Sequence, residues 1–298
     1  MEDKKMICKV CGSDKHKLKF EHVSDINFNM TNRLYNWYSC SDCDTFQILP
    51  IDFKKEELSE YYEEYDPHSH KLKLVSRFSN SPISLVINHI KSLKNLNDEF
   101  SVLDIGCGDG NLLYNLRNSF PKSILYGIDY NIASSSYNLV DSNVNLFQGN
   151  LVDFKFEIQF DFICNSQLLE HLDEPEDLFN LLKSTLKVDG IGFLDIPNAD
   201  SKSFKLFGKN WVHLDTPRHR ILYKTNSLNK ILEKYNFQKI RIQYFGTGFA
   251  YLSSFLLFVK EKKLFTMKLP FKIQWVISKC IQLFLKSDDK IFLVFKHK

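Results

Sequence analysis

The sequence has no long apolar run, and its net charge is small. Its most apolar window, Phe249–Val259, holds eleven residues, whereas a membrane-spanning helix needs about 20. The first residues, MEDKKMICKVCG, lack the apolar core of a signal peptide. The formal net charge of +3 gives no argument for nucleic-acid binding. We therefore expect a cytoplasmic protein with no transmembrane segment, and the small charge disfavours a nucleic-acid partner.

Cysteine is scarce, and four of the seven cysteines fall into two C-x-x-C pairs, Cys8 with Cys11 and Cys40 with Cys43. In a reducing compartment such residues act as metal ligands or buried thiols sooner than as disulfides. Each pair can direct two thiolates at one ion, and two pairs complete the tetrathiolate shell of structural zinc. A redox pair would need a thioredoxin-like βαβ context, which is absent here. We predict a zinc-binding module over residues 1–50, with Leu34–Ser39 as the return strand of a hairpin.

The next fifty residues, 51–100, have the pattern of a helical linker and lid. Residues 54–65 (KKEELSEYYEEY) are charged and carry a tyrosine stripe, and Asp66-Pro67 ends that helix. A second apolar stripe at helical spacing predicts a helix over Pro82–Leu96. We expect the tyrosines to pack on a neighbouring element.

From Ser101 onward, apolar strand-like runs alternate with helical stretches, which predicts βαβ units and a parallel sheet covered on both faces. We predict an α/β fold over residues 101–298: a doubly wound, Rossmann-like, mostly parallel sheet of seven strands. Two insertions are expected, 197–226 on the acceptor side and a helical one at 246–288. The predicted strands are Val102–Ile105, Ile124–Ile128, Val144–Phe147, Phe160–Cys164, Ile191–Ile196, Lys239–Tyr244 and Ile291–Phe295.

The helical insertion at 246–288 has apolar faces flanked by lysines. Such a segment can lie on a membrane surface, or it can cap the sheet or form a dimer contact. We favour the packed helical pair, and peripheral contact with the inner face of the membrane stays open.

The stretch SVLDIGCGDG, residues 101–110, places an acid and three glycines at the end of the first predicted strand. Glycines at this turn let a ligand approach the backbone, and the following helix offers unpaired N–H groups. A dinucleotide loop would read G-x-G-x-x-G, but here Gly106, Gly108 and Gly110 alternate and Asp104 precedes them. That carboxylate would repel a pyrophosphate but suits a cation such as S-adenosylmethionine. Asp129, at the tip of the next strand, is placed to accept two ribose hydroxyls.

Residues 101–196 resemble class I S-adenosylmethionine-dependent methyltransferases at four ordered motifs: VLDIGCGDG, YGIDYN, FDFICNSQLLEHL and LKVDGIGFLDIPN. The resemblance implies S-adenosyl-L-methionine as the cofactor. It adds Cys107, Tyr130, Asn150, Leu151 and Asn165 to the cofactor contacts. The family often has Gly-Asp after the third strand, where this chain reads Gly149-Asn150, so the adenine contact is expected from Asn150 or from backbone.

A narrower resemblance covers nearly the whole chain. The double C-x-x-C, the linker ELSEYYEEYD and the segment W-x-x-L-D-x-P-R-H (Trp211–His219) recur in bacterial methyltransferases of sugar, surface-polysaccharide and secondary-metabolite biosynthesis. The resemblance implies a sugar, a nucleotide-linked or phosphorylated sugar, or a related small metabolite as the acceptor. Two alternatives stay open: an RNA methyltransferase with a zinc module, and an inactive cofactor-binding assembly protein.

Methyl transfer to a hydroxyl or amine needs a group that removes the acceptor's proton, and histidine suits this near neutral pH. The candidates are His219 in TPRHR and His171 in LLEHLDEP, with Glu170 placed to orient a histidine. Each histidine can instead serve a structural role. Arg218 and Arg220 can clamp a phosphate or form ion pairs with Asp215 or Glu170. Cys164 and Cys280 are expected to be core thiols.

Overall fold

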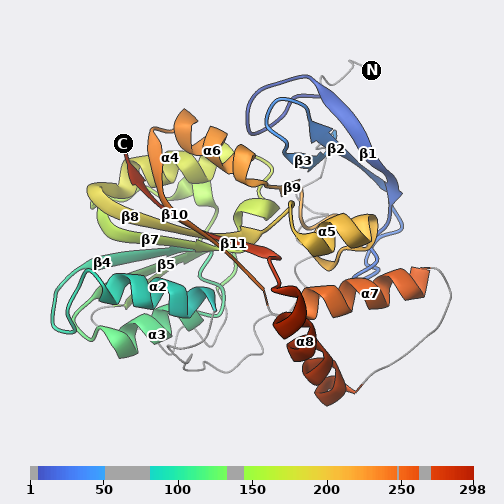
Figure 1. The fold of residues 1–298 in the computed structure, drawn as a ribbon. Coiled ribbons are helices and arrows are strands. Elements are labelled where there is room, and N and C mark those ends of the chain that lie inside the picture. The colour runs from blue at the N-terminus through green and yellow to red at the C-terminus, as the bar shows by residue number, and fades with distance from the viewer. Residues whose placement is uncertain (1–5, 51–80, 133–143, 247, 262–269) are drawn as a thin grey trace.

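The computed structural model describes residues 6–50, 81–132, 144–246, 248–261 and 270–298. The predicted helix at 54–65 and the rest of the linker up to residue 80 lie outside these residues. Figure 1 shows one central sheet with helices on both sides, and a smaller sheet at the N-terminal end of the chain.

The central sheet has seven strands in the order β10-β11-β8-β7-β4-β5-β6. Five neighbours, from β8 to β6, run parallel, while β11 is antiparallel to both β8 and β10. The predicted doubly wound, mostly parallel sheet is therefore confirmed. The strands are β4 Ser101–Ile105, β5 Ile124–Asp129, β6 Val144–Gln148, β7 Phe160–Ser166, β8 Leu186–Pro197, β10 Phe237–Phe245 and β11 Lys290–His297.

Helices cover both faces of this sheet (Figure 1). Helices α2 (Pro82–Lys91) and α3 (Asn111–Ser119) pack in one hydrophobic cluster that includes Val102 of β4. Helices α4 (Pro175–Thr185) and α6 (Thr225–Lys234) pack in another, which includes Leu103 of the same strand. Because successive strand residues point to opposite faces, the apolar run of β4 supplies both cores.

Local sequence explains where the first helix begins and ends. The Ser81 hydroxyl caps α2 by accepting from the Ser84 N–H at 3.2 Å, and Pro82 occupies the first turn, where its missing N–H costs nothing. The helix ends at Lys91, five residues before the predicted end at Leu96. The buried side chains of α2 include Val86, Ile87 and Ile90, which is the stripe expected from the sequence.

The N-terminal residues form strands β1 (His16–Val23), β2 (Tyr35–Cys40) and β3 (Phe46–Ile48), which pair antiparallel. The predicted hairpin with its return strand is confirmed. This sheet takes its fourth strand, β9 (Ile221–Leu222), from the predicted acceptor-side insertion. Trp37, fully buried, donates its indole N–H to the Thr216 hydroxyl at 2.9 Å. The module and the insertion therefore share a sheet and a core.

The remaining helices surround this junction. Helix α5 (Lys202–Phe207) joins the module's core, and α7 (Phe249–Glu261) and α8 (Phe271–Leu285) form the expected helical pair beside it (Figure 1). The short 3-10 turns are η3 Leu151–Asp153, η4 Leu169–His171, η5 Gly208–Asn210 and η6 Val212–Leu214. Among the described residues, no helix combines the length and the hydropathy that crossing a bilayer requires.

Two expectations were wrong in detail. Strand β8 begins at Leu186, five residues before the predicted start at Ile191, so Asp189 and Gly190 are part of the strand, beside an irregularity in its pairing with β7. Gly190 is needed there because an added Cβ would lie 2.9 Å from the Lys187 carbonyl oxygen. Cys280 is exposed on α8 and is not a core thiol, whereas Cys164 is buried as predicted.

Candidate functional site

The loop after β4 folds back over the end of β5 through backbone contacts. Gly106, Gly108 and Gly110 all have positive φ, between 48° and 79°, a conformation that glycine adopts without strain. The Ile128 carbonyl accepts from the N–H groups of Gly106 at 2.8 Å and Cys107 at 3.1 Å. Gly110 stands directly before helix α3 as its N-cap. The loop thus sits at the carboxyl ends of the parallel strands, where ligands bind in open α/β sheets.

Asp104 lies at the base of this loop and is 3% exposed. Burial, helped by the nearby carboxylates of Asp129 and Asp109, raises the pKa of its carboxyl to about 8. A cation bound against Asp104 would stabilise the ionised form. The site is therefore poised for a positively charged ligand.

A cavity of about 520 Å³ opens between the loop, the end of β7 and helix α2. No Lys, Arg or His is among the described residues that line it, which disfavours an anion. Two buried acceptors at its wall, Asn165 Oδ1 and Asp195 Oδ1, have no hydrogen-bond partner within the described part of the chain. The lining includes Asp104, Gly106, Cys107, Gly108, Asp109, Asn111, Leu112, Cys164, Asn165, Ser166, Gln167, Phe193 and Asp195.

The lining fits the ammonium and sulfonium of S-adenosylmethionine, since it offers a buried acid and unpaired acceptors and no competing cation. Asn165 is held in place by donating its amide N–H to the Ile105 carbonyl at 3.0 Å. Asp129 caps the loop, accepting the Gly108 N–H at 2.8 Å and the Asn131 N–H at 2.9 Å. Both contacts fix its carboxylate at the tip of β5.

The other predicted cofactor contacts are dispersed. Cys107 is buried under the loop and close to Gly127, where an added Cβ would come within 2.9 Å of its sulfur. Tyr130 is 56% exposed. Asn150 donates to the Asp153 carboxylate at 3.2 Å, and Leu151 begins the turn η3 beside it. Cys107 lines the cavity, whereas Tyr130, Asn150 and Leu151 are not among its described lining residues.

Sequence reasoning missed Asp195, near the end of β8. Its side chain is 2% exposed and accepts from the Ser166 hydroxyl at 2.9 Å and the Gln167 amide at 3.2 Å. Lys290 of β11 is 4.0 Å away, yet burial raises the pKa of Asp195. An acid inside the buried run GFLDIP was the available signal, because buried acids that serve no function are rare.

Glu170, His171 and His219 come together although 49 positions separate the first from the last. The Arg220 N–H donates to the Glu170 carbonyl at 2.8 Å and joins the two segments. The rings of His171 and His219 meet edge to face, with centroids 4.6 Å apart. His219 Nε2 lies 4.0 Å from Glu170 Oε1 and 3.9 Å from Asp215 Oδ2. The structure thus groups all three candidate catalytic residues.

Burial controls ionisation in this cluster. It raises the pKa of Glu170 to about 8 and lowers that of His171 to about 3, the latter helped by the charge of His219. Burial also lowers the pKa of His219, against the opposing effect of Asp215. Both imidazoles are therefore neutral near pH 7, the form that can accept a proton or bind a metal.

The two arginines beside His219 are already engaged. Arg218 is 2% exposed; its Nε donates to Asp215 Oδ2 at 3.0 Å and its guanidinium lies 3.7 Å over the Phe28 ring. Arg220 pairs with Asp173 at 3.0 Å and donates to the His171 carbonyl. These contacts support the structural alternative, in which the arginines hold the insertion in place, over a phosphate clamp.

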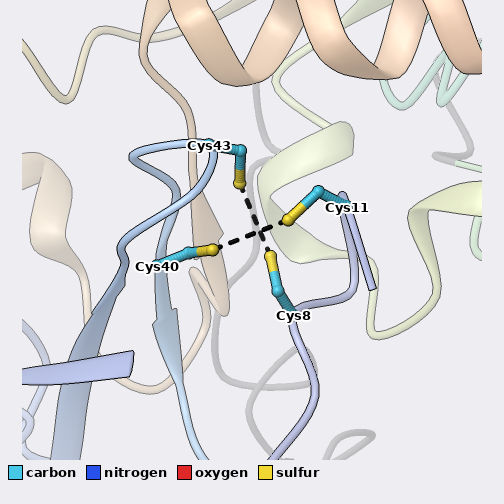
Figure 2. A group of neighbouring side chains, drawn as sticks. All are labelled: Cys8, Cys11, Cys40 and Cys43. Atoms are coloured by element: carbon cyan, nitrogen blue, oxygen red, sulfur yellow. Dashed lines mark hydrogen bonds between the residues drawn. The ribbon is translucent and has the colours of Figure 1, made fainter. Parts of the chain in front are cut away.

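The four predicted metal ligands converge. Figure 2 shows the side chains of Cys8, Cys11, Cys40 and Cys43 pointing toward one centre, from the first turn of the chain and from the end of β2. The Sγ pairs Cys8–Cys43 and Cys11–Cys40 are each 3.6 Å apart. A zinc ion with Zn–S bonds of about 2.3 Å holds its sulfurs about 3.8 Å apart. The donor set and its spacing therefore fit a tetrahedral ion.

The comparisons with known proteins identify a methyltransferase domain. A family model described as a methyltransferase domain matches residues 63–242, more than half of the chain. The ubiquinone biosynthesis O-methyltransferase of Rickettsia bellii is 22% identical over 174 residues, which cover 55% of this chain and 72% of that protein.

Solved structures also resemble this chain. A chain of the complex between the Haloferax volcanii Trm112 methyltransferase activator and a methyltransferase matches with a TM-score of 0.51 and 11% identity, covering 70% of this chain and 87% of that one. PKMT2 from Rickettsia typhi, in complex with AdoHcy, has a TM-score of 0.44 and 13% identity. That match covers 66% of this chain but only about half, 48%, of the other. At 11% identity, the match to the Haloferax volcanii complex supports the fold and nothing more.

Proposed function

Because this chain belongs to the methyltransferase-domain family and is an S-adenosylmethionine-dependent methyltransferase, we propose that it methylates a hydroxyl of a sugar or a related small metabolite. The observation that carries the proposal is the cavity at the ends of β4 and β7, with buried Asp104 at its base and no cationic lining residue among those described. Its volume of about 520 Å³ lies in the range of small-molecule sites.

The cofactor would supply an already activated methyl group, so the chain's main task is to hold donor and acceptor in line. Asp104, Asn165 and Asp195 would bind the charged end of the cofactor. Asp129 would accept from the ribose hydroxyls while it keeps the glycine loop closed through Gly108. Cys107 would fill the space beneath that loop.

Proton removal from the acceptor falls to the cluster of Glu170, His171 and His219. His219 holds its Nδ1–H on the His213 carbonyl at 2.7 Å, which turns Nε2 toward Glu170 and Asp215. A neutral imidazole fixed in this tautomer can accept a proton at Nε2. His171, whose ring meets that of His219, would share the task.

Oxygen is the proposed acceptor atom for two reasons. A hydroxyl needs a base, and the buried cluster provides one. The curated relatives from Rickettsia bellii are named O-methyltransferases. The sugar class rests on the Trp211–His219 segment and its likeness to polysaccharide and secondary-metabolite enzymes. Arg218 and Arg220 are paired within the chain, so a phosphate on the acceptor would need other groups to bind it.

The four cysteines are proposed to bind zinc in a structural role. All four positions of a tetrahedral ion would be filled by protein sulfur, which leaves none for substrate. The ion would hold the end of β2 and the start of β3 together. Because β9 pairs with β3, the ion would also help to keep the segment before β9, which includes His219, beside Glu170.

The experiment is a label-transfer screen. The full chain is incubated with S-adenosylmethionine carrying an isotope-labelled methyl group and four acceptor pools: free sugars, nucleotide-sugars, hydroxylated aromatics and total RNA. Mass spectrometry then locates the label. Transfer to a sugar hydroxyl is expected; transfer to RNA alone, or to nitrogen or carbon, would contradict the proposed acceptor. Tight cofactor binding without any transfer would favour an inactive assembly protein.

A further inference from the structure

The Glu170 side chain is in an unusual position for a carboxylate. It is fully buried, and neither Oε1 nor Oε2 has a hydrogen-bond partner in the described residues. The nearest arginines are already paired, Arg218 with Asp215 and Arg220 with Asp173. Burying such a group without compensation is costly. A ligand that carries positive charge would remove that cost.

Two imidazoles lie beside Glu170, each with a ring nitrogen within 4.8 Å of a Glu170 carboxylate oxygen. The His219 Nδ1 lies 2.7 Å from the His213 carbonyl oxygen, and the His171 Nδ1 lies 3.0 Å from the Arg218 carbonyl oxygen. A carbonyl only accepts, so each Nδ1 carries the proton and each Nε2 carries the lone pair. Metal-binding histidines are oriented in this way, with the outer nitrogen bonded to a carbonyl or carboxylate.

We propose that Glu170, His171 and His219 bind a divalent transition-metal ion of the zinc class. One ligand atom from each lies within 4.8 Å of the other two. Two imidazoles and one carboxylate are the ligand set of open, catalytic zinc sites, in which a fourth position remains for water or substrate. This site would differ from the four-cysteine site, which is closed.

The spacing needs little adjustment. Bonds of about 2.0–2.1 Å in a tetrahedral shell place neighbouring ligand atoms about 3.3 Å apart. The His219 Nε2 and Glu170 Oε1 atoms are 4.0 Å apart, and no two ligand atoms of the three residues are more than 4.8 Å apart, so closure of up to about 1.5 Å through side-chain rotation is enough. Asp215 Oδ2, 3.9 Å from His219 Nε2, adds negative charge next to the ion.

Metal binding by Glu170, His171 and His219 does not depend on the proposed function. If that function holds, the ion would give the site a way to activate the acceptor hydroxyl. An acceptor hydroxyl in the open position would lose its proton more easily, since a bound divalent ion lowers the pKa of a coordinated oxygen. The cluster would then act through the ion, and His219 would be a ligand and not itself the base.

The test counts metal and identifies each site. The full chain is stripped with a chelator, titrated with Co²⁺ under reducing conditions, and analysed for bound metal and absorption. Two equivalents are expected: one with intense thiolate charge-transfer bands, and a second with only the weaker bands of nitrogen and oxygen ligands. His219→Ala and Glu170→Gln should each lose the second equivalent and keep the first.

The matched control is His213→Ala, which removes a neighbouring, partly buried imidazole but leaves the His213 carbonyl on His219. It should retain both equivalents. The proposal would be overturned if the wild-type chain bound only one equivalent of Co²⁺, the one with thiolate charge-transfer bands. This outcome does not depend on whether the variants fold. A second equivalent retained in His219→Ala would also overturn the proposal. S-adenosylhomocysteine binding, measured on the same samples, separates failure of the metal site from failure of the proposed function.

Discussion

Gly108 donates its backbone N–H to the Asp129 carboxylate at 2.8 Å, so the loop after β4 is tied to the tip of β5. The same carboxylate also accepts the Asn131 N–H at 2.9 Å. The two acids of the site therefore act differently. Asp104 is buried at the base of the cavity, and Asp129 shapes the loop that closes it.

The hydrogen bond from Gly108 to Asp129 predicts that Asp129→Ala and Asp129→Asn weaken cofactor binding to different extents. Asp129→Ala removes both backbone contacts, and we expect S-adenosylhomocysteine to bind roughly 10- to 100-fold more weakly, because hydrogen bonds to charged groups contribute about 1.5–3 kcal/mol. Asp129→Asn keeps an acceptor for Gly108 and should lose less. Calorimetric titration of both variants measures this, and equal losses would show that the loop contact is unimportant.

Cofactor affinity should rise with pH. The pKa of Asp104 in the free protein is raised to about 8, so below pH 8 this group is mostly protonated. A cationic ligand favours the ionised form, so binding releases a proton and the affinity increases with pH, by up to about tenfold per unit, and levels off above pH 8. Titrations with S-adenosylmethionine between pH 6 and 8.5 measure the slope.

The matched variants for this slope are Asp104→Asn and Glu170→Gln. The first should flatten the pH dependence, since it removes the titrating group. The second should leave it intact, although the pKa of Glu170 is also raised to about 8. A dependence that survives in Asp104→Asn would assign it to another group.

The pair of buried Arg218 and largely buried Asp215 should carry much of the insertion's stability. Asp215→Asn keeps the size of the side chain and tolerates the positive φ of 40° at this position, but it removes the charge that compensates Arg218. We expect a loss of roughly 3 kcal/mol in the free energy of unfolding. Asp25, at 3.7 Å from Arg218, limits the loss.

Equilibrium unfolding in urea measures this change, with Asp200→Asn as the control. Asp200 pairs with Lys205 at 3.1 Å, but both side chains are more than half exposed. Its loss should cost less than about 1 kcal/mol. Comparable losses in the two variants would mean that the buried pair has no special role.

Loss of the four-cysteine metal should loosen the small sheet first. In a Cys40→Ser, Cys43→Ser variant, we expect amide hydrogen exchange to accelerate in β2 and β3, because their ends are held by the ion. Strands β4 and β5 pair within the central sheet and should exchange as before. A variant that retains its metal, or one whose β4 exchanges as fast as β2, would contradict the proposed structural zinc.

Replacement of His219 should separate binding from turnover. We expect His219→Ala to lower kcat by 100-fold or more on an acceptor found in the label-transfer screen, since proton removal contributes about 10²–10⁴. The Kd for S-adenosylhomocysteine should stay the same, because His219 is absent from the residues described as lining the cavity. Unchanged turnover would remove His219 from the mechanism.

The central fold was predictable because the inner strands of its sheet, such as β4 and β7, are buried on both faces and appear as continuous apolar runs. The predicted strands, such as Val102–Ile105, lie within observed ones, and the glycine loop lies where its spacing placed it. Strand β9 was not predictable: its two residues form a strand only because β3 lies beside them. Local sequence patterns cannot predict a strand pairing that depends on contacts between distant parts of the chain.

The site was predicted in part for the same reason. Asp104, Gly106 and Asn165 belong to local motifs, and they line one cavity. The sequence identified Glu170 and His219 as candidates but did not predict that they would lie close together. The hydrogen bond from the Arg220 backbone N–H to the Glu170 carbonyl explains their proximity. Asp195 went unnoticed because its acid sits inside a strand and outside any loop motif.

The measurement that tests the central claim most directly is calorimetric titration of the purified chain with S-adenosylhomocysteine, with NAD as the control ligand. The account predicts micromolar binding of the first and none of the second, because the cavity offers a buried acid and unpaired acceptors and, among its described lining residues, no cation for a pyrophosphate. Binding of NAD without S-adenosylhomocysteine would contradict the assignment of Asp104 and the glycine loop.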